Sequence, residues 1–305
     1  MAIYENGIRV NSTWESVIDS RFINFCLGML YASLPDWQYP LASGATWHEK
    51  KYYLLQNKNA LPPVPSRSGQ QRLEFGDYFA FFKENSIDLS KQVWLKQGRA
   101  VAYAYLHIIL NSPFFIQRFN IDSSGFLDST EGRMDWLQSY FDWVCGYNTQ
   151  LRYSATEELQ VIQNCYKGII NNSRLRLGDN FNELSTDEDR DWLLSKVNRL
   201  GAKIPYKLAN MLQSVMDMAE LEIFIQGVVD CCLFGSGEEF ARQLKQYLAN
   251  RKYRQRQKQE HKKPFNTQMD KKTEKYLKEL SRHYRMNKED IFAVIVKDAH
   301  DKMKN

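Results

Sequence analysis

Five consecutive residues near the carboxyl end of this chain constrain its fold more than any other segment. Phe265, Asn266, Thr267, Gln268 and Met269 follow the two-residue period of a β-strand, with the first, third and fifth on one face and the two amides on the other. A single strand leaves its backbone groups unpaired and is not stable alone. No second strand-like segment lies nearby, so we predict that it pairs with the same strand of a second copy as a two-fold antiparallel ribbon.

Helical spacing begins directly after this segment. Within residues 271–284, the side chains Tyr276, Leu277, Leu280 and Tyr284 recur at the intervals of a core-facing helical surface. The spacing therefore predicts one helix over these residues.

A second helix is predicted after a short turn. Asn287 is a typical N-cap residue, and Glu289 and Asp290 favour the positive end of a helix dipole. The apolar residues that follow form two stripes at helical intervals, namely Ile291, Phe292, Val294, Ile295, Val296 and Ala299. Apolar residues on nearly all sides of a short helix indicate burial against more than its own chain, and about forty residues are too few for an independent core. Both features favour an intertwined dimer.

The order strand, helix, tight turn, helix, preceded by a basic segment, resembles the ribbon-helix-helix family (the MetJ/Arc/CopG repressor fold) over residues 263–304. The resemblance implies a homodimer whose paired strands enter the major groove of double-stranded DNA. It implies that Asn266 and Gln268 read base edges, since amides can bond bidentately to adenine. It also implies that Asn287 and Lys288 grip a phosphate at the second helix N-terminus. The expected dimer core is Phe265, Thr267, Met269, Leu277, Leu280, Ile291, Val294 and Ile295.

Two positions depart from the pattern of that family. The turn after the first helix usually has glycine with a positive φ, and this chain has Arg285 there, at an expected cost of about 1 kcal/mol. The middle inward-facing strand residue is usually aliphatic and is Thr267 here, so a weaker ribbon core is expected.

Charge is unevenly distributed along the 305 residues. Residues 241–305 contain 19 Lys and Arg against 8 Asp and Glu, a net charge of +11, whereas the preceding part has a net charge of −6. A basic tail on an acidic body is typical of a polyanion-binding appendage, although such tails also serve only to solubilise. The residues expected to contact DNA phosphates in this tail, besides the helix terminus, are Arg254, Arg256, Lys258, Lys262 and Lys263.

The predicted fold class is mainly α. It comprises a large helical body (1–250), a basic linker (251–263) and the ribbon-helix-helix domain (264–305), with a subdomain break in the body near 172–185. Asn6-Gly7 between two β-prone runs predicts a small hairpin at the start of the body. The sequence shows no internal repeat. Helices are expected over residues 13–31, 74–83, 91–111, 134–145, 156–171, 206–229 and 237–259, and another is expected to start within 185–189 and to end at Gly201.

The cysteines, the N-terminus and the apolar segments predict the cellular compartment of the protein. The cysteines Cys26, Cys145, Cys165, Cys231 and Cys232 are odd in number and have no metal-binding spacing, which favours reduced thiols in a cytosolic protein. The N-terminus has no basic and apolar leader pattern. The most apolar stretch is interrupted by polar residues, so no membrane association is expected. These features predict a cytoplasmic, nucleoid-associated protein.

No constellation in the body predicts catalysis, a metal site or a cofactor. His48-Glu49-Lys50 lacks the second histidine of a zinc-protease helix. Arg99 and His107 share a predicted helix with no acid beside them, so Arg99 is expected at the surface.

The function expected is that of a sequence-specific DNA-binding homodimer whose body binds a protein partner or ligand, or oligomerises further. Transcriptional regulation and service on a mobile element, in plasmid replication, partition or relaxosome assembly during conjugation, both fit this expectation. Two other classes stay open: a toxin- or nuclease-like enzyme with a DNA-targeting tail, and a chromosome-organising protein that bridges two DNA sites.

Overall fold

The computed structural model describes residues 3–5, 8–10, 13–33, 45–65, 71–72, 74–111, 129–151, 155–172, 174–177, 181, 184, 186–200, 211–232, 236–259 and 270–304. For residues 3–5, 8–10, 71–72, 148–151, 236, 257–259 and 271, the description covers the backbone alone.

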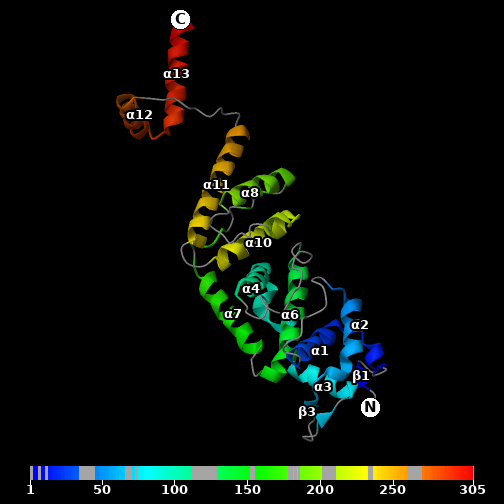
Figure 1. The fold of residues 1–305 in the computed structure, drawn as a ribbon. Helices are drawn as coiled ribbons and strands as arrows, with labels where there is room; N and C mark the ends of the chain where they lie inside the picture. Colours follow the sequence, from blue (N-terminus) through cyan, green and yellow to red (C-terminus); the bar gives the residue numbers. More distant parts are fainter. Residues whose placement is uncertain are drawn as a thin grey trace. The chain divides into compact units, whose positions relative to one another are not determined.

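The described chain is mainly helical, which confirms the predicted fold class (Figure 1). The α-helices are α1 (Ser20–Ser33), α2 (Trp47–Asn57), α3 (Phe75–Asn85), α4 (Gly98–Asn111), α6 (Thr130–Leu151), α7 (Ala155–Ile170), α8 (Asp187–Leu200), α10 (Met218–Cys231), α11 (Ser236–Gln259), α12 (Lys271–Tyr284) and α13 (Lys288–Lys304). Short 3-10 helices are η1 (Trp14–Ser16), η2 (Lys58–Ala60), η3 (Leu89–Lys91) and η4 (Val93–Lys96).

The described strands are short and lie in the body. β1 (Ile3–Glu5) pairs antiparallel with β2 (Ile8–Val10), and β3 (Val64–Pro65) pairs antiparallel with β4 (Gln71–Arg72). The predicted turn residues Asn6 and Gly7 lie outside the described residues.

The chain divides into two compact parts, Met1–Leu248 and Ala249–Asn305, which we call the body and the C-terminal unit. Helix α11 spans this division and continues to Gln259, so the first nine residues of the expected linker are helical. The subdomain break expected near 172–185 stays a prediction.

Helices α1 and α6 form the most extensive helix–helix contact among the described elements of the body. A β-carbon at Gly28 of α1 would overlap the carbonyl oxygen of Trp143, and one at Gly146 of α6 would overlap that of Phe25. Only glycine lets two helix backbones approach so closely, since every other residue has a β-carbon in this space.

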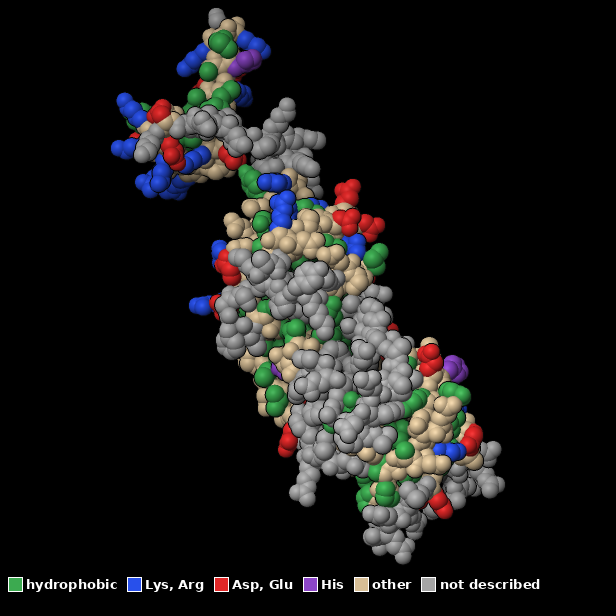
Figure 2. All heavy atoms as spheres, viewed as in Figure 1, with side chains coloured by type: hydrophobic (Ala, Val, Ile, Leu, Met, Phe, Trp, Pro, Cys, Tyr) green, Lys and Arg blue, Asp and Glu red, His purple; other side chains and the backbone are tan. Residues whose placement is uncertain are grey.

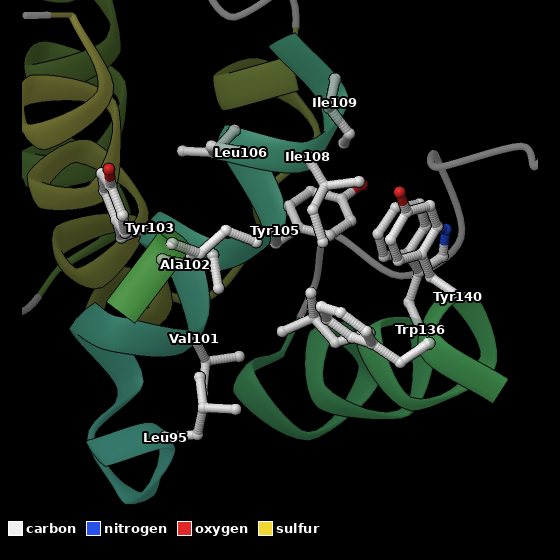
Figure 3. Close-up of a cluster of buried hydrophobic side chains, with 14 of the residues drawn as sticks. Leu95, Val101, Ala102, Tyr103, Tyr105, Leu106, Ile108, Ile109, Trp136 and Tyr140 are labelled. Atoms are coloured by element: carbon white, nitrogen blue, oxygen red, sulfur yellow. The ribbon is translucent and has the colours of Figure 1, made fainter. Parts of the chain in front are cut away.

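Helix α4 lies in the middle of the body core. Its residues Ala100–Leu106 are at most 1% exposed because α6, α7 and α10 all pack against it. Figure 3 shows Tyr105 turned toward Trp136 and Tyr140 of α6, while Tyr103 points away from them on another side of α4.

Three predicted helices do not begin where the hydrophobic spacing indicates. The one expected over 91–111 begins as α4 only at Gly98, after the 3-10 helix η4. The other two are interrupted. The helix expected over 13–31 is interrupted, and α1 begins where Asp19 accepts hydrogen bonds from the amides of Arg21 and Phe22. The single helix expected over 206–229 is also wrong, because Asp217 caps α10 by accepting a hydrogen bond from the amide of Glu220. In both places an aspartate starts a new helix inside an apolar pattern.

A fully buried carboxylate joins α1 to α6. Asp142 accepts hydrogen bonds from Nε and Nη2 of Arg21 at 3.0 and 2.9 Å. Gln138, one turn earlier, donates to Asp142 Oδ1 and to the carbonyl of Ile87, and accepts from the amide of Leu89. Burial raises the pKa of Asp142 to about 6, against the opposing effect of Arg21. We call this arrangement the first clasp.

The same bonds between the same atoms recur between α4 and α10. Asp230 is fully buried and accepts from Nε and Nη2 of Arg99 at 2.7 and 2.8 Å. Gln226, one turn earlier, donates to Asp230 Oδ1 and to the carbonyl of Leu175, and accepts from the amide of Leu177. This is the second clasp, and it corrects the expectation that Arg99 is a surface residue without an acidic partner.

The clasps reveal an internal repeat that the sequence does not show. The first repeat comprises α1, α3, residues 87–89 and α6, and the second comprises α4, α7, residues 175–177 and α10. The ring pairs Phe25–Phe82 and Tyr103–Tyr166 have the same centroid distance of 5.4 Å, although their interplanar angles are 65° and 35°. Since α4 precedes α6 in the chain, the two repeats are interleaved.

Candidate nucleic-acid interface

Helix α12 begins at a side-chain cap, directly after the alternating segment. Asp270 Oδ1 accepts hydrogen bonds from the amides of Lys272 and Thr273, both at 2.8 Å, and Oδ2 accepts from the Thr273 hydroxyl. These bonds, chiefly those from Thr273, lower the pKa of Asp270 below its usual 3.8. The N-terminus of α12 is therefore fixed at the position that the sequence predicts.

The turn between α12 and α13 has the conformation expected of it. Arg285 has φ 53° and ψ 35°, and it is the one non-glycine residue with positive φ among those described. The amides of Arg285 and Met286 both donate to the carbonyl of Ser281, which closes the end of α12. The prediction that an arginine occupies the left-handed position of this turn is confirmed.

The amino end of α13 is capped as predicted, but its first turn is crowded. Asn287 Oδ1 accepts a hydrogen bond from the Asp290 amide at 2.8 Å, and its amide nitrogen donates to the Asp290 carboxylate. Lys288 Nζ lies 3.3 Å from Glu274 Oε1 of α12, and both side chains are well exposed. A phosphate here would meet the remaining first-turn amides and Lys288, and would compete with Glu274 for that lysine.

The predicted dimer-core residues differ widely in exposure. Leu277 and Ile291 are 8% and 3% exposed, and Leu280 is half-buried. Val294 and Ile295 are 48% and 45% exposed in the single chain. Phe265, Thr267 and Met269 lie outside the described residues. The two helices thus bury Leu277 and Ile291, and they leave the apolar side chains of Val294, Ile295 and Val296, which span about 200° around α13, uncovered in the single chain.

The basic residues expected to contact phosphates fall on different sides of α11. Arg254 and Arg256 are exposed and form no ion pair within the described parts of the chain. A two-residue spacing puts them about 200° apart around a helix, whereas Arg254 and Lys258 share a side. The Lys258 side chain, and all of Lys262, Lys263, Asn266 and Gln268, lie outside the description.

Lys and Arg side chains gather over the C-terminal unit in the view of Figure 2, with exposed hydrophobic side chains of α13 beside them.

The sequence did not predict two contacts within this unit. The Tyr253 hydroxyl donates to Glu289 at 3.3 Å, and Lys288 pairs with Glu274. Neither pair has a sequence signal, because both join exposed side chains from different helices.

A charged cavity lined by described residues of the body is a candidate for a second site. It has a volume of about 400 Å³ and is lined by Arg174, Glu238, Glu239, Arg242 and Lys245. Arg242 is held by Glu239, and Lys245 donates to the carbonyl of Arg174, so these charges are already engaged.

Among the residues that the structure describes, no three His, Cys, Asp or Glu side chains meet closely enough to hold a metal ion. None of the described helices has both the length and the apolar content to cross a membrane.

No family model, no curated protein and no solved structure matches this chain. Function is therefore inferred from the residues themselves.

Proposed function

We propose that this protein is a homodimer that binds specific double-stranded DNA sequences through its C-terminal unit. In this proposal, the strands formed by residues 265–269 of two copies pair into a ribbon, and Asn266 and Gln268 of each copy read bases in the major groove. The body then recruits a partner to the bound site, in transcriptional regulation or in service of a mobile element.

The observation that carries this proposal is the uncovered apolar surface of α13. Val294, Ile295 and Val296 are each about half exposed in the single chain. Leaving three branched apolar side chains on a charged helix in water is unfavourable, by up to about 2 kcal/mol for each. A second copy would cover them, and two copies would at the same time bring two alternating segments together.

The helix starts and the turn support the same arrangement. The cap at Asp270 begins α12 immediately after the alternating segment, and Arg285 turns the chain sharply into α13. Charge supports a polyanionic ligand, since the C-terminal unit carries most of the basic excess of the chain. Arg254 and Arg256 are exposed and unpaired within the described residues, so they are available to phosphates.

The test starts with selection of bound sequences from a random DNA pool by the full-length protein. A two-fold symmetric site is expected, because the dimer axis imposes its symmetry on the DNA. Asn266→Ala and Gln268→Ala should each weaken binding to the selected site by roughly 1–3 kcal/mol and leave binding to random DNA almost unchanged.

A second set of variants tests the phosphate contacts. Arg254→Gln combined with Lys258→Gln should weaken binding to selected and random DNA alike and reduce the dependence of affinity on salt. Lys167→Gln on α7 is the matched control, since Lys167 is an exposed lysine of the body. If the amide and basic variants behave alike, or if the protein stays monomeric at concentrations that bind DNA, the proposal is wrong.

A further inference from the structure

The amino end of α13, where a DNA phosphate is expected to bind, is surrounded by acidic side chains. Lys288, the cation expected to contact that phosphate, is followed in the same turn by Glu289 and Asp290. A third acid, Glu274, reaches this place from the first turn of α12. One ammonium group thus stands among three carboxylates, and the summed charge opposes an incoming phosphate.

The three carboxylates are held by different kinds of partner. Glu289 and Asp290 accept hydrogen bonds from uncharged groups, a tyrosine hydroxyl at 3.3 Å and an asparagine amide at 2.6 Å. Glu274 Oε1 instead lies 3.3 Å from Lys288 Nζ and accepts a hydrogen bond from it. Glu274 is therefore the carboxylate that engages the cation of the expected phosphate site.

The packing of α12 on α13 sets the position of this ion pair. Glu274 and Lys288 each lie three residues before a buried residue of their own helix, Leu277 and Ile291. Residues three apart lie on the same side of a helix, so both charged side chains stand at the edge of the contact between the two helices. The amide of Glu274 also donates to the carbonyl of the capping residue Asp270 at 3.0 Å. The pair is thus a consequence of the helix arrangement.

We propose that Glu274 is an autoinhibitory residue of the C-terminal unit: its carboxylate engages Lys288 in the free protein, and a DNA phosphate must displace it to bind there. This inference rests on the proposed function, because the phosphate that competes with Glu274 belongs to bound DNA. The contact lowers the affinity for all DNA sequences alike, since phosphate contacts carry no direct sequence information.

Glu274→Gln tests the proposal, because it removes the carboxylate and keeps the size of the side chain. The affinity of the full-length protein for a random duplex should rise about three- to tenfold, since an exposed ion pair contributes up to about a factor of five and a dimer has two copies. The affinity for the selected site should rise by the same factor. Fluorescence anisotropy of labelled duplexes measures both, and the affinity should also fall more steeply with salt as Lys288 gains a phosphate.

Glu279→Gln is the matched control on the same helix. Glu279 is exposed and lies about 140° around α12 from Glu274, so this variant changes the net charge equally without touching Lys288. It should raise the affinity by less than about twofold, because salt screens a charge that is distant from the phosphate. Equal effects of the two variants would overturn the proposal.

The sign of the effect separates autoinhibition from a structural role. If Glu274 served only to stabilise α12, losing its ion pair and its favourable place in the first turn would loosen the helix and weaken DNA binding. A lower affinity of Glu274→Gln would therefore also overturn the proposal.

A double variant tests whether Glu274 acts through Lys288. Lys288→Gln alone should weaken binding to selected and random DNA. In that background, Glu274→Gln should raise the affinity no more than Glu279→Gln does, because the cation that it releases is gone. If Glu274→Gln keeps its full effect without Lys288, the ion pair is not the cause and the proposal is wrong.

Asn266→Ala distinguishes failure of this inference from failure of the proposed function. If Asn266→Ala weakens binding to the selected site while Glu274→Gln and Glu279→Gln agree, autoinhibition alone is wrong. If the wild-type protein binds no duplex DNA, both proposals are wrong.

Discussion

Helix α4 of the body and helix α13 of the C-terminal unit are both apolar on most sides, yet they differ in how much of that surface is covered. Residues Ala100–Leu106 of α4 are at most 1% exposed, since three other helices pack against them. In α13, Ile291 is buried against α12 while Val294–Val296 remain about half exposed. The difference lies in the number of covering elements within the chain, not in the helices themselves.

This difference indicates that the two parts become stable in different ways. An apolar helix must be covered on every apolar side, and the body achieves this with its own helices. The C-terminal unit has one helix to cover another, which is too little for an independent core. Substitutions in the body should therefore act on folding, and equivalent substitutions in the C-terminal unit should act on association.

The largest effect is expected at the contact between α1 and α6. Gly28→Ala places a methyl group against the Trp143 carbonyl and should lower the free energy of unfolding of the body by about 3 kcal/mol. The control is Gly168→Ala on α7, where a β-carbon meets nothing within 4 Å, and it should raise stability by roughly 0.5–1 kcal/mol. Denaturant unfolding measures both, and a loss of stability in the control variant would contradict this account.

A smaller effect is expected on association of the C-terminal unit. Val294→Asp puts a carboxylate into the uncovered apolar surface of α13 and should weaken the dimer by roughly 2 kcal/mol, while the unfolding temperature of the body stays the same. Sedimentation equilibrium of the full-length protein measures the change. Lys297→Asp, a charge change at an exposed position of the same helix, should weaken association much less. Equal effects of the two variants would show that this apolar surface is not the interface.

The turn between α12 and α13 should respond by about 1 kcal/mol. Arg285→Gly removes the steric cost of φ 53° and should raise the stability of the C-terminal unit by that amount. Arg282→Gly, three residues earlier inside α12, should lower it by a similar amount through the poor helix propensity of glycine. Thermal unfolding followed on the C-terminal unit should give opposite signs for the two variants.

The smallest effect is the pH dependence of the α12 cap. Because hydrogen bonds lower the pKa of Asp270 below 3.8, its ionised form stabilises the first turn above that pH, and the contribution is lost as pH falls through the lowered pKa. Nuclear magnetic resonance of the Thr273 amide should show the first turn fraying in this acidic range. Asp270→Asn keeps an N-cap residue but cannot titrate, so fraying that persists in this variant would rule out Asp270 as its cause.

Local patterns predicted much of the C-terminal unit. The helical spacing of apolar residues predicted α12 and α13. The resemblance to the ribbon-helix-helix pattern predicted that Arg285 is the left-handed residue of the turn. Asn287 was identified as an N-cap because its short polar side chain precedes two acids. Each of these features depends on residues only a few positions apart. The ribbon itself involves two chains and residues outside those described, so it stays a prediction.

The clasps could not be predicted in the same way. Arg21 and Asp142 are separated by 121 residues and Arg99 and Asp230 by 131, so no local pattern connects them. The repeats share few residue types, since Phe25, Met29, Phe81 and Phe82 of one correspond to Tyr103, His107, Cys165 and Tyr166 of the other. The helices of the two repeats are also interleaved along the chain, so the repeat does not recur at a fixed spacing in the sequence. Such a repeat becomes visible only when the hydrogen bonds of each carboxylate are compared.

The duplicated clasp has a practical consequence. The hydrogen bonds around Asp142 and Asp230 are the same, while the side chains packed beside them differ. Each clasp can therefore serve as the internal control for substitutions in the other, within one molecule and under identical conditions.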